Sequence, residues 1–568
     1  MYRRSNKSQQ LSLFTNTHTL LTGRALKTYE DNHEWHNQFR IQVTERIDED
    51  LFRPLYREDF GAPNASIRVM IGMMILKEAH GWSDSQLFEQ SQFNLLVRSA
   101  LGLPNIDDAI PASSTYYLLR KKIVAWENQG NENLIEKVFS QTTKSQVLEF
   151  KINGNKIRMD SKLMGSNIAW YSRYELIHET LRKVYGPFKN QIDKLLTVSE
   201  ISLLERLSGE GGDKVSYRST KSEIESKISG LGIIIFKIIS GMPNESSDTV
   251  STLRRVFGEQ YQVVDDIVSA RPKQEISASS VQSPYDTECH YRKKDENQVK
   301  GYSINVTETC DAGSKLNLVT HVAVDTASAA DCEFLQPSIE ATRKVVCQKI
   351  ETVNADGAYH STDNQDYCQR KDIDLIVSAI QGKPSRYDLA LDDNQELIVT
   401  DLTTNTPVEV RQVESRKEGN APKWAIRNEK GILRYFTQKE IDTCLLRKQI
   451  AARPQAELNV RNNVEATIFQ LGYHYSNDKS RYRGLIKHKM WANVRCIWIN
   501  FVRISNFVAG GGSIWEQNPQ NETFLSIIWS IFVKHRSEMV PLMNLSYRYP
   551  CFSSRIDEKQ GWISIFKK

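Results

Sequence analysis

The residues that decide the fold are KIRMDSKLM at 156–164, where helical patterns give way to short β-rich segments. Ile157 and Met159 alternate with polar side chains there, which is the two-residue period of a strand. CEFLQPSIEATRKVVC (332–347) has the pattern of a helix. The other strand-length segments are GYSINVTETC (301–310), LNLVTHVAVDT (316–326), IETVNADGAY (350–359) and DIDLIVSAI (372–380). The order strand, hairpin, helix, strand, helix, strand predicts a mixed α/β sheet.

Two long regions interrupt this predicted sheet. Residues 171–280 are charge-rich and mostly helical in pattern, and residues 385–436 are polar and β-rich, with LIVTDL and VEVRQV as candidate strands. Both are too long to be loops of a compact domain, so each is expected to have structure of its own. Helical patterns at 437–452 and 461–471 follow. We predict one domain at 151–508 that carries the two insertions.

Helical patterns fill the region before the sheet. SIRVMIGMMILKEAHG (66–81) and SDSQLFEQSQFNLLVRSALG (83–102) each open with a Ser and close at a Gly, which are the residues that begin and end helices. PASSTYYLLRKKIVAW (111–126) offers Ser and Thr caps at 113–115, and its basic turn consists of Arg120, Lys121 and Lys122. We predict a helical N-terminal DNA-binding domain at 1–150. A helix-turn-helix DNA reader and a plain bundle with a solvated basic face are both open.

Composition excludes several classes of protein. Of the 568 residues, 40% are hydrophobic and 25% charged, as in an ordinary soluble globular protein of three or four domains. No apolar segment near the N-terminus resembles a signal peptide, and the longest apolar stretch, 524–533, is shorter than the roughly 20 residues that span a bilayer. The eight cysteines contain no C-x-x-C pair, which favours reduced thiols in a cytoplasmic protein. Residues 509–568 form a C-terminal tail of unknown role.

The positive charge is concentrated in one segment. The net charge is +5, but residues 441–505 contain eleven Lys or Arg against four acids, which is +7 and leaves −2 elsewhere. Such a segment favours a polyanion partner, because binding would release counterions. Trp491, Trp498 and Phe501 lie among these basic residues, where they could form either a nucleic-acid surface or part of the core.

Three carboxylates are candidates for chemistry, although each has a plain alternative. Asp160 lies within a strand, where Asp is disfavoured, yet it could face solvent on an edge strand. Asp356 follows a strand at its carboxyl end, where α/β sheets bind ligands, yet Asp-Gly is also a common turn. Glu465 lies at the border of the apolar face of a helix, yet it could simply pair with Arg461 one turn earlier.

Together these acids match a known chemical need. Two acids at strand ends and a third from a later helix can converge on one edge of a sheet. Carboxylate oxygens are the ligands that Mg²⁺ or Mn²⁺ prefers, and about three of them can hold two ions. Two ions roughly 4 Å apart stabilise the attacking and the leaving oxygen of an in-line phosphoryl displacement. The sequence therefore predicts phosphodiester cleavage or transfer with two Mg²⁺ or Mn²⁺ ions.

The chain resembles the DDE transposases of bacterial insertion sequences, with an InsH-like helical N-terminal segment and an RNase H-like catalytic domain. The resemblance covers roughly residues 51–504. It is carried by IRMDSKLMGSNIAW (157–170), SPYDTECHYRKK (283–294) with GYSINVTET (301–309), VNADGAYHS (353–361) and RNNVEATIFQLGYHYSNDKSRYRGLIKHKMWANVRC (461–496). It implies an α/β fold in which Asp160, Asp356 and Glu465 are the catalytic, metal-binding triad.

The resemblance also implies partners and further contacts. Arg461 would contact a DNA phosphate, whereas Leu458 stands where relatives carry a Tyr and Gly472 stands where a Lys is expected. We expect Asp286 and Glu288 to be structural or DNA-facing, and His321 and His360 to be ordinary polar residues. Other candidate DNA contacts, for which a solvated surface is the alternative, are Arg120, Lys121, Lys122, Arg292, Lys293, Lys294, Lys479, Arg481, Arg483, Lys487 and Lys489.

The implied activity is DNA transposition. The N-terminal domain would bind the terminal inverted repeats of an insertion sequence as double-stranded DNA. The catalytic domain would cut the strand and join the freed 3′-OH to target DNA, within a homo-oligomer in the nucleoid of a bacterial cytoplasm. A metal-dependent nuclease of the same fold and a catalytically inactive DNA-binding remnant are the alternatives.

Overall fold

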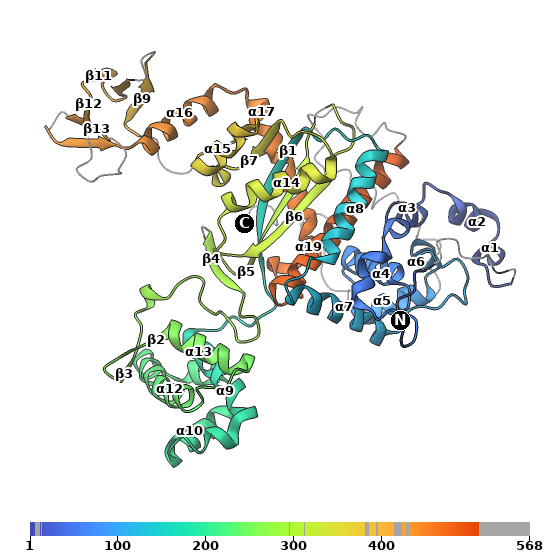
Figure 1. Cartoon of the computed structure of the whole chain (residues 1–568), viewed down its shortest axis with the longest axis horizontal. Coiled ribbons are helices and arrows are strands. Elements are labelled where there is room, and N and C mark those ends of the chain that lie inside the picture. The colour runs from blue at the N-terminus through green and yellow to red at the C-terminus, as the bar shows by residue number, and fades with distance from the viewer. Residues whose placement is uncertain are drawn as a thin grey trace, which may run out of the picture. The chain divides into compact units, whose positions relative to one another are not determined.

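The computed structural model describes residues 1–5, 12, 14–294, 296–311, 313–380, 385–392, 396–413, 423–427 and 431–510 (Figure 1). All of them belong to one compact unit, residues 1–512. The predicted tail at 509–568 lies outside the described residues except for Ala509 and Gly510. None of the helices in the described part of the chain is both long and apolar enough to cross a bilayer.

Helices occupy the described residues before the first strand. They are α1 (Thr17–Leu20), α2 (Gly23–Glu30), α3 (Trp35–Gln42), η1 (Thr44–Arg46), η2 (Glu49–Leu55), α4 (Ile67–His80), α5 (Asp84–Phe93), α6 (Leu95–Ala100), α7 (Ser113–Asn128) and α8 (Leu134–Glu149). As predicted, α4 begins at the Ser66 cap and ends at Gly81, where φ is +66°. Only glycine adopts that conformation readily.

Two details of these helices differ from the sequence prediction. The single helix expected at 83–102 is broken at Asn94, whose side-chain oxygen accepts from the backbone N–H groups of Leu96 and Val97 and so begins α6. The predicted cap within 113–115 is wrong, because α7 already begins at Ser113, and Ala112 precedes it without a side-chain cap.

The six-stranded sheet has the predicted mixed character. Its members are β1 (Lys156–Gly165), β4 (His290–Lys294), β5 (Asn297–Thr309), β6 (Val319–Thr326), β7 (Thr352–Ala355) and β8 (Asp374–Val377). The order is β4-β5-β1-β7-β8, with β6 also paired to β5. β1 is antiparallel to β5 and parallel to β7, which is parallel to β8. The crossover helices are α14 (Leu335–Val346) and α15 (Thr362–Arg370).

Strand β4 was not predicted. Its sequence HYRKK lacks the apolar alternation of a strand, because β4 lies at the edge of the sheet and its residues Lys293 and Lys294 are exposed. Conversely, β1 lies between β5 and β7, so the edge-strand alternative for Asp160 is wrong.

The two interruptions have cores of their own, as expected. The first consists of α9 (Arg173–Ile192), α10 (Val198–Gly209), α11 (Gly212–Arg218), α12 (Lys221–Gly241), α13 (Asp248–Gln260), β2 (Tyr261–Val264) and β3 (Ile267–Ala270). Capping boxes begin three of these helices. The second has two three-stranded sheets made of β9 (Tyr387–Leu391), β10 (Leu397–Asp401), β11 (Thr406–Val408), β12 (Arg411–Val413), β13 (Lys423–Arg427) and β14 (Leu433–Phe436). The single strand expected at VEVRQV is split, because Val408 ends β11 and Arg411 begins β12.

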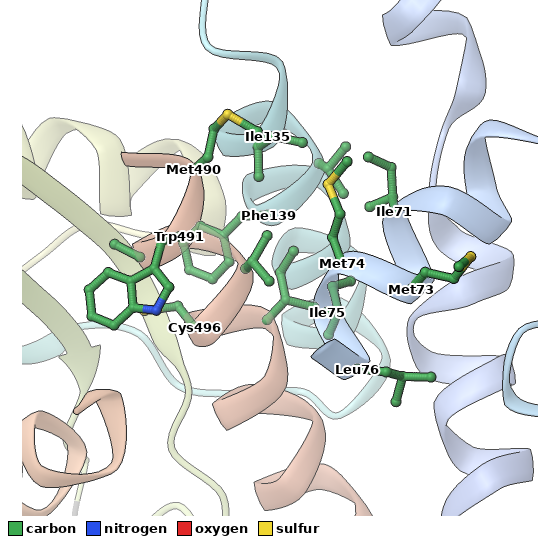
Figure 2. Close-up of a cluster of buried hydrophobic side chains, with 14 of the residues drawn as sticks. Ile71, Met73, Met74, Ile75, Leu76, Ile135, Phe139, Met490, Trp491 and Cys496 are labelled. Atoms are coloured by element: carbon green, nitrogen blue, oxygen red, sulfur yellow. The ribbon is translucent and has the colours of Figure 1, made fainter. Parts of the chain in front are cut away.

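After the second insertion the chain returns to the sheet through helices. These are α16 (Gln438–Ala452), α17 (Gln455–Asn459), η6 (Val460–Asn463), α18 (Val464–Leu471), η7 (Ser476–Asp478) and α19 (Leu485–Ala509). Figure 2 shows the core that α19 shares with α4 and α8, in which Ile75, Phe139 and Trp491 lie close together. The same core includes Val306 of β5. The helical N-terminal region and one face of the sheet therefore share a single apolar core.

The aromatic residues of α19 belong to this core. Trp491 and Phe501 are both buried, and Trp498 is half-buried against the same cluster. The core interpretation is confirmed for these rings.

We expect Phe139→Ala to lower the free energy of unfolding by about 3–5 kcal/mol, because it opens a cavity at the centre of the shared core. Denaturant unfolding followed by tryptophan fluorescence measures the change. Phe93→Ala is the control, since Phe93 is 77% exposed, and we expect a change within about 0.5 kcal/mol. Equal effects of the two substitutions would contradict the shared core.

Candidate active site

The three predicted carboxylates come from neighbouring elements. Asp160 lies on β1, Asp356 directly follows β7, and Glu465 lies in the first turn of α18. The parallel register ends with the pair of Arg158 and Asn354, and Asp160 and Asp356 each follow this pair by two residues. The structure thus brings together two acids that are almost 200 residues apart in sequence.

Arg461 joins all three carboxylates. Its Nη2 atom lies 2.8 Å from Oδ2 of Asp160 and 3.9 Å from Oδ2 of Asp356, and its Nη1 atom lies 3.7 Å from Oε1 of Glu465. The pair of Arg461 with Glu465, which was the plain alternative for that Glu, is therefore present but forms part of a larger cluster. The guanidinium shows that the three acids face one small region.

Backbone groups orient the two aspartates. Oδ1 of Asp160 accepts from the N–H of Ser161, and Oδ1 of Asp356 accepts from the N–H of Gly357. The turn interpretation of Asp356 is also correct, since this residue begins the short helix η5 (Gly357–Tyr359). One oxygen of each carboxylate remains directed toward Arg461.

Burial sets the electrostatics of the cluster. Exposure of the side chains increases from 15% at Asp160 to 39% at Asp356 and 63% at Glu465. Burial raises the pKa of Asp160 above its usual range, although the charge of Arg461 opposes the shift. Burial by itself would lower the pKa of Arg461, but the neighbouring acids raise it. The deepest carboxylate is thus the one that most depends on a positive partner.

The donor types suit a hard divalent cation. Three carboxylates face one guanidinium, which leaves a formal charge of −2, and Nε of Arg461 is buried without a hydrogen-bond partner. Within the described part of the chain, however, no three Asp, Glu, His or Cys side chains stand close enough to hold one ion as they are placed. Arg461 lies between the acids, so its guanidinium would have to move for all three to share an ion.

Sequence reasoning missed a fourth carboxylate in this region, Glu308 of β5. Its side chain is fully buried. Oε1 accepts from Nε of Arg158 at 2.6 Å, and Oε2 lies 2.8 Å from Nη1 of Arg503 and accepts from the Thr467 hydroxyl at 2.7 Å. Burial would raise the pKa of Glu308, but the two guanidinium groups and the hydroxyl lower it to about 2. Glu308 is therefore charged throughout the physiological pH range.

A sequence signal for this pair existed. Glu308 follows Tyr302, Ile304 and Val306 on the apolar face of its strand, where a charge requires a partner. That partner, Arg158, stands directly opposite on β1. Without the pairing of β1 with β5, which sequence alone does not specify, the signal could not be interpreted.

Most predicted DNA contacts also bind groups of the protein itself. Basic side chains near the end of α4 and β1 hold neighbouring backbone carbonyls: Lys479 donates to Ile168, Arg481 to Gly81 and Trp82, and Arg483 to Asn167. Lys122 donates to Leu55, and Arg292 to Ala329. Arg120 lies over the rings of Tyr116 and Tyr482, and Lys489 pairs with Glu127.

Seven of the predicted DNA contacts are exposed. Lys479, Arg481 and Arg483 are the three that also donate to backbone carbonyls, and the other four are Lys121, Lys293, Lys294 and Lys487. Lys121 of α7 and Lys487 of α19 line the same groove, of about 470 Å³. Lys293 and Lys294 lie on the edge strand β4. These four lysines therefore divide between two surfaces.

Asp286 and Glu288 take part in the local structure. Asp286 is buried and accepts from the hydroxyls of Ser166 and Tyr302 and from the N–H of Gly484, while Glu288 accepts from the N–H of Leu485. These bonds attach the segment before α19 to the sheet. His321, in turn, is half-buried, and burial lowers its pKa to about 4.

Two family models match the chain. A transposase domain (DUF772) matches residues 27–122, and a transposase DDE domain matches residues 263–501. The two ranges together cover more than half of the sequence. The chain belongs to the DDE transposases. The second match contains Asp356 and Glu465, whereas Asp160 precedes it.

Wider comparisons add little to this assignment. The transposase is similar to the cryo-EM structure of a piggyBac transposase synaptic complex with hairpin DNA, with 9% sequence identity over 92% of this chain and 86% of that chain. The TM-score of 0.27 is too low to support an argument. No curated protein matches the chain.

We expect Glu308→Gln to destabilise the transposase by about 3–5 kcal/mol at pH 7, because it leaves two buried guanidinium groups without their carboxylate. The folded-state pKa of Glu308 is lowered, so its contribution is complete above the usual Glu pKa and is lost as pH falls toward 2. Denaturant unfolding at pH 7 and pH 3 should therefore show a smaller difference at pH 3. The exposed Glu333→Gln serves as the control, and a difference independent of pH would contradict the charged network.

Proposed function

We propose that this chain is the transposase of an insertion sequence, that it acts on the terminal inverted repeats of its own element, and that Asp160, Asp356 and Glu465 are its catalytic residues. DDE transposases generally use divalent metal ions, and the three acids would hold two Mg²⁺ or Mn²⁺. The order β6-β5-β1-β7-β8, antiparallel on one side of β1 and parallel on the other, supports an RNase H-like catalytic domain.

One observation carries the proposal: a single guanidinium contacts all three acids. Three carboxylates on separate elements repel one another, and a structure that gathers them needs a cationic ligand there. A surface ion pair would use one acid and would not need the parallel register of β1 and β7. A metal-binding site therefore explains the convergence of the three acids better than a stabilising ion pair does.

The side chains have separate tasks in this mechanism. Bound divalent ions would activate a water or the 3′-OH of a cut strand for attack on the phosphate, and would stabilise the oxygen that leaves as the opposite P–O bond breaks. Asp160 and Asp356, fixed through the N–H groups of Ser161 and Gly357, would set the position of their free oxygens. The more exposed Glu465 would provide the third carboxylate ligand from α18. Arg461 would turn from the carboxylates to a DNA phosphate, which offers the same bidentate geometry.

DNA would be bound by the exposed lysines. Lys121 and Lys487 line the groove between α7 and α19. Both helices are packed into the shared core, so the groove would offer a duplex a well-supported surface. Lys293 and Lys294 on β4 form the second surface. Two surfaces suit an enzyme that holds an element end and a target duplex, and a homo-oligomer would bring two ends together.

The decisive test is cleavage of labelled duplex DNA that carries the element's ends, with Mg²⁺ or Mn²⁺. We expect Asp160→Asn, Asp356→Asn and Glu465→Gln to bind these ends normally and to neither nick nor join them, since each removes one metal-binding charge. Asp363→Asn, an exposed acid in the first turn of α15, is the control and should retain activity.

The outcomes separate the candidate functions. Nicking without joining by the unmodified protein would indicate a nuclease of the same fold. Specific binding with no cleavage at all would indicate an inactive DNA-binding remnant. Equal cleavage by the three variants would disprove the assignment of the carboxylates.

We expect the double substitution Lys121→Ala, Lys487→Ala to weaken DNA binding and to reduce the slope of log Kd against log salt concentration by about 0.9 for each DNA phosphate that these lysines neutralise. Fluorescence anisotropy at several KCl concentrations measures both. Lys214→Ala, Lys221→Ala removes two exposed lysines from the first insertion and is the matched control. An unchanged slope in the first variant, together with a reduced slope after Lys293→Ala, Lys294→Ala, would indicate that DNA binds to the β4 surface instead.

A further inference from the structure

The helix that carries Glu465 is held at its C-terminal end by Arg495, which donates to the carbonyls of Gln470 and Leu471, whereas Glu465 lies in its first turn. α18 has eight residues, of which Val464, Thr467 and Leu471 are buried. The preceding α17 and η6 contain no buried residue. Glu465 itself is 63% exposed and contacts only Arg461 among the ion pairs of the described residues. The position of its carboxylate therefore depends on how α18 is seated on the sheet.

The buried carboxylate of Glu308 provides that seat. The Thr467 hydroxyl, two residues after Glu465, donates to Oε2 of Glu308 at 2.7 Å and accepts from Nη2 of Arg503 at 2.5 Å. On the other side, Arg158 donates through Nε to Glu308 and through Nη1 to the carbonyl of Val460 at 3.2 Å. Val460 is the residue before Arg461. One carboxylate is thus linked to both ends of the segment that carries Arg461 and Glu465.

We propose that Glu308 is a positioning residue: through the Thr467 hydroxyl it fixes Glu465, and through Arg158 it fixes Arg461, relative to the two aspartates. The inference rests on the proposed function, since it assigns a role to Glu308 only if Glu465 binds metal. It adds a buried carboxylate whose partners are Arg158, Thr467 and Arg503.

The chemistry of the network favours positioning over simple stability. Burying one carboxylate and two guanidinium groups is expensive, and apolar side chains of similar volume often stabilise a core as well or better. What a charged network adds is direction, because each hydrogen bond restricts an angle as well as a distance. Here the restricted groups are the hydroxyl of α18 and the carbonyl before Arg461. Substitution of a residue that hydrogen-bonds to a metal ligand and orients it commonly weakens metal affinity by about 10–100-fold.

Thr467 offers the sharper test, since Glu308→Gln is expected to destabilise the fold. Thr467→Val removes the hydroxyl and keeps the shape of the side chain, so Glu308 retains both arginines. Thr467→Ser removes a methyl group and keeps the hydroxyl. If the hydrogen bond of Thr467 positions α18, Thr467→Val should weaken metal binding and Thr467→Ser should not. If packing of the side chain positions α18, Thr467→Ser should weaken metal binding more than Thr467→Val.

The experiment measures Mn²⁺ binding to the full chain by calorimetry and by the loss of the free-ion electron paramagnetic resonance signal. The Mn²⁺ concentration that gives half-maximal cleavage is measured in parallel. We expect Thr467→Val to raise the Mn²⁺ Kd and this half-maximal concentration by about 10–100-fold. Thr467→Ser should stay close to the unmodified protein, and the Kd for DNA should not change in either.

Asp286→Asn is the matched control. Asp286 is also a buried carboxylate with three donors, but none of them belongs to α18. We expect it to lower Tm and leave Mn²⁺ binding unchanged. Equal loss of Mn²⁺ affinity in this control, or an unchanged Kd in Thr467→Val, would overturn the positioning role.

The same experiment separates this inference from the proposed function. If the unmodified chain binds no Mn²⁺ and Asp160→Asn makes no difference, the metal-binding triad is wrong and the role of Glu308 fails with it. If Asp160→Asn abolishes Mn²⁺ binding and Thr467→Val does not affect it, the triad stands and only the positioning role is overturned.

Discussion

A fully buried carboxylate has to be neutralised, and at Glu308 this requirement determines how four elements meet. Its partners come from β1, α18 and α19, while Glu308 itself lies on β5. None of these elements could be moved by one turn or one register step without leaving a charge unpaired in the core, at a cost of several kcal/mol. The sheet, the Glu465 helix and the long C-terminal helix are thereby held in one arrangement.

Helix α19 also connects this arrangement to the N-terminal helices. Arg495 donates to the carbonyl of Glu78 in α4, and the carboxylate of Glu78 accepts from the hydroxyls of Tyr475 and Tyr482 in the segment between α18 and α19. At Gly81 an added Cβ would lie 2.9 Å from the ring of His474, so the contact needs a glycine. The helices matched by the transposase domain model are thus continuous with the six-stranded sheet through packing and hydrogen bonds.

Sequence alone predicted what depends on local pattern. The strand period at 156–164, the caps of α4 and the order of strands and helices in the sheet follow from neighbouring residues, and the structure has them. The break at Asn94 and the strand β4 were missed, because the first is a cap within a helical pattern and the second an edge strand with polar side chains. For the candidate site, Asp160, Asp356 and Glu465 converge on Arg461 as the sequence led us to expect, and their catalytic role stays a prediction. Glu308 could not be chosen, because its importance appears only once β1 and β5 are paired.

Charge in the sequence differs from charge on the surface, and this limits what a basic segment can predict. Residues 441–505 carry a net charge of +7, but several of these cations are used internally. Arg495 holds backbone carbonyls, Arg503 neutralises Glu308, and Arg461 holds the three acids. A cation that is already paired releases no counterion when DNA binds, so it contributes nothing to the salt dependence. The affinity for DNA should therefore depend on the exposed basic residues, including those that hold only backbone carbonyls, together with Arg461 once a phosphate replaces its carboxylate partners.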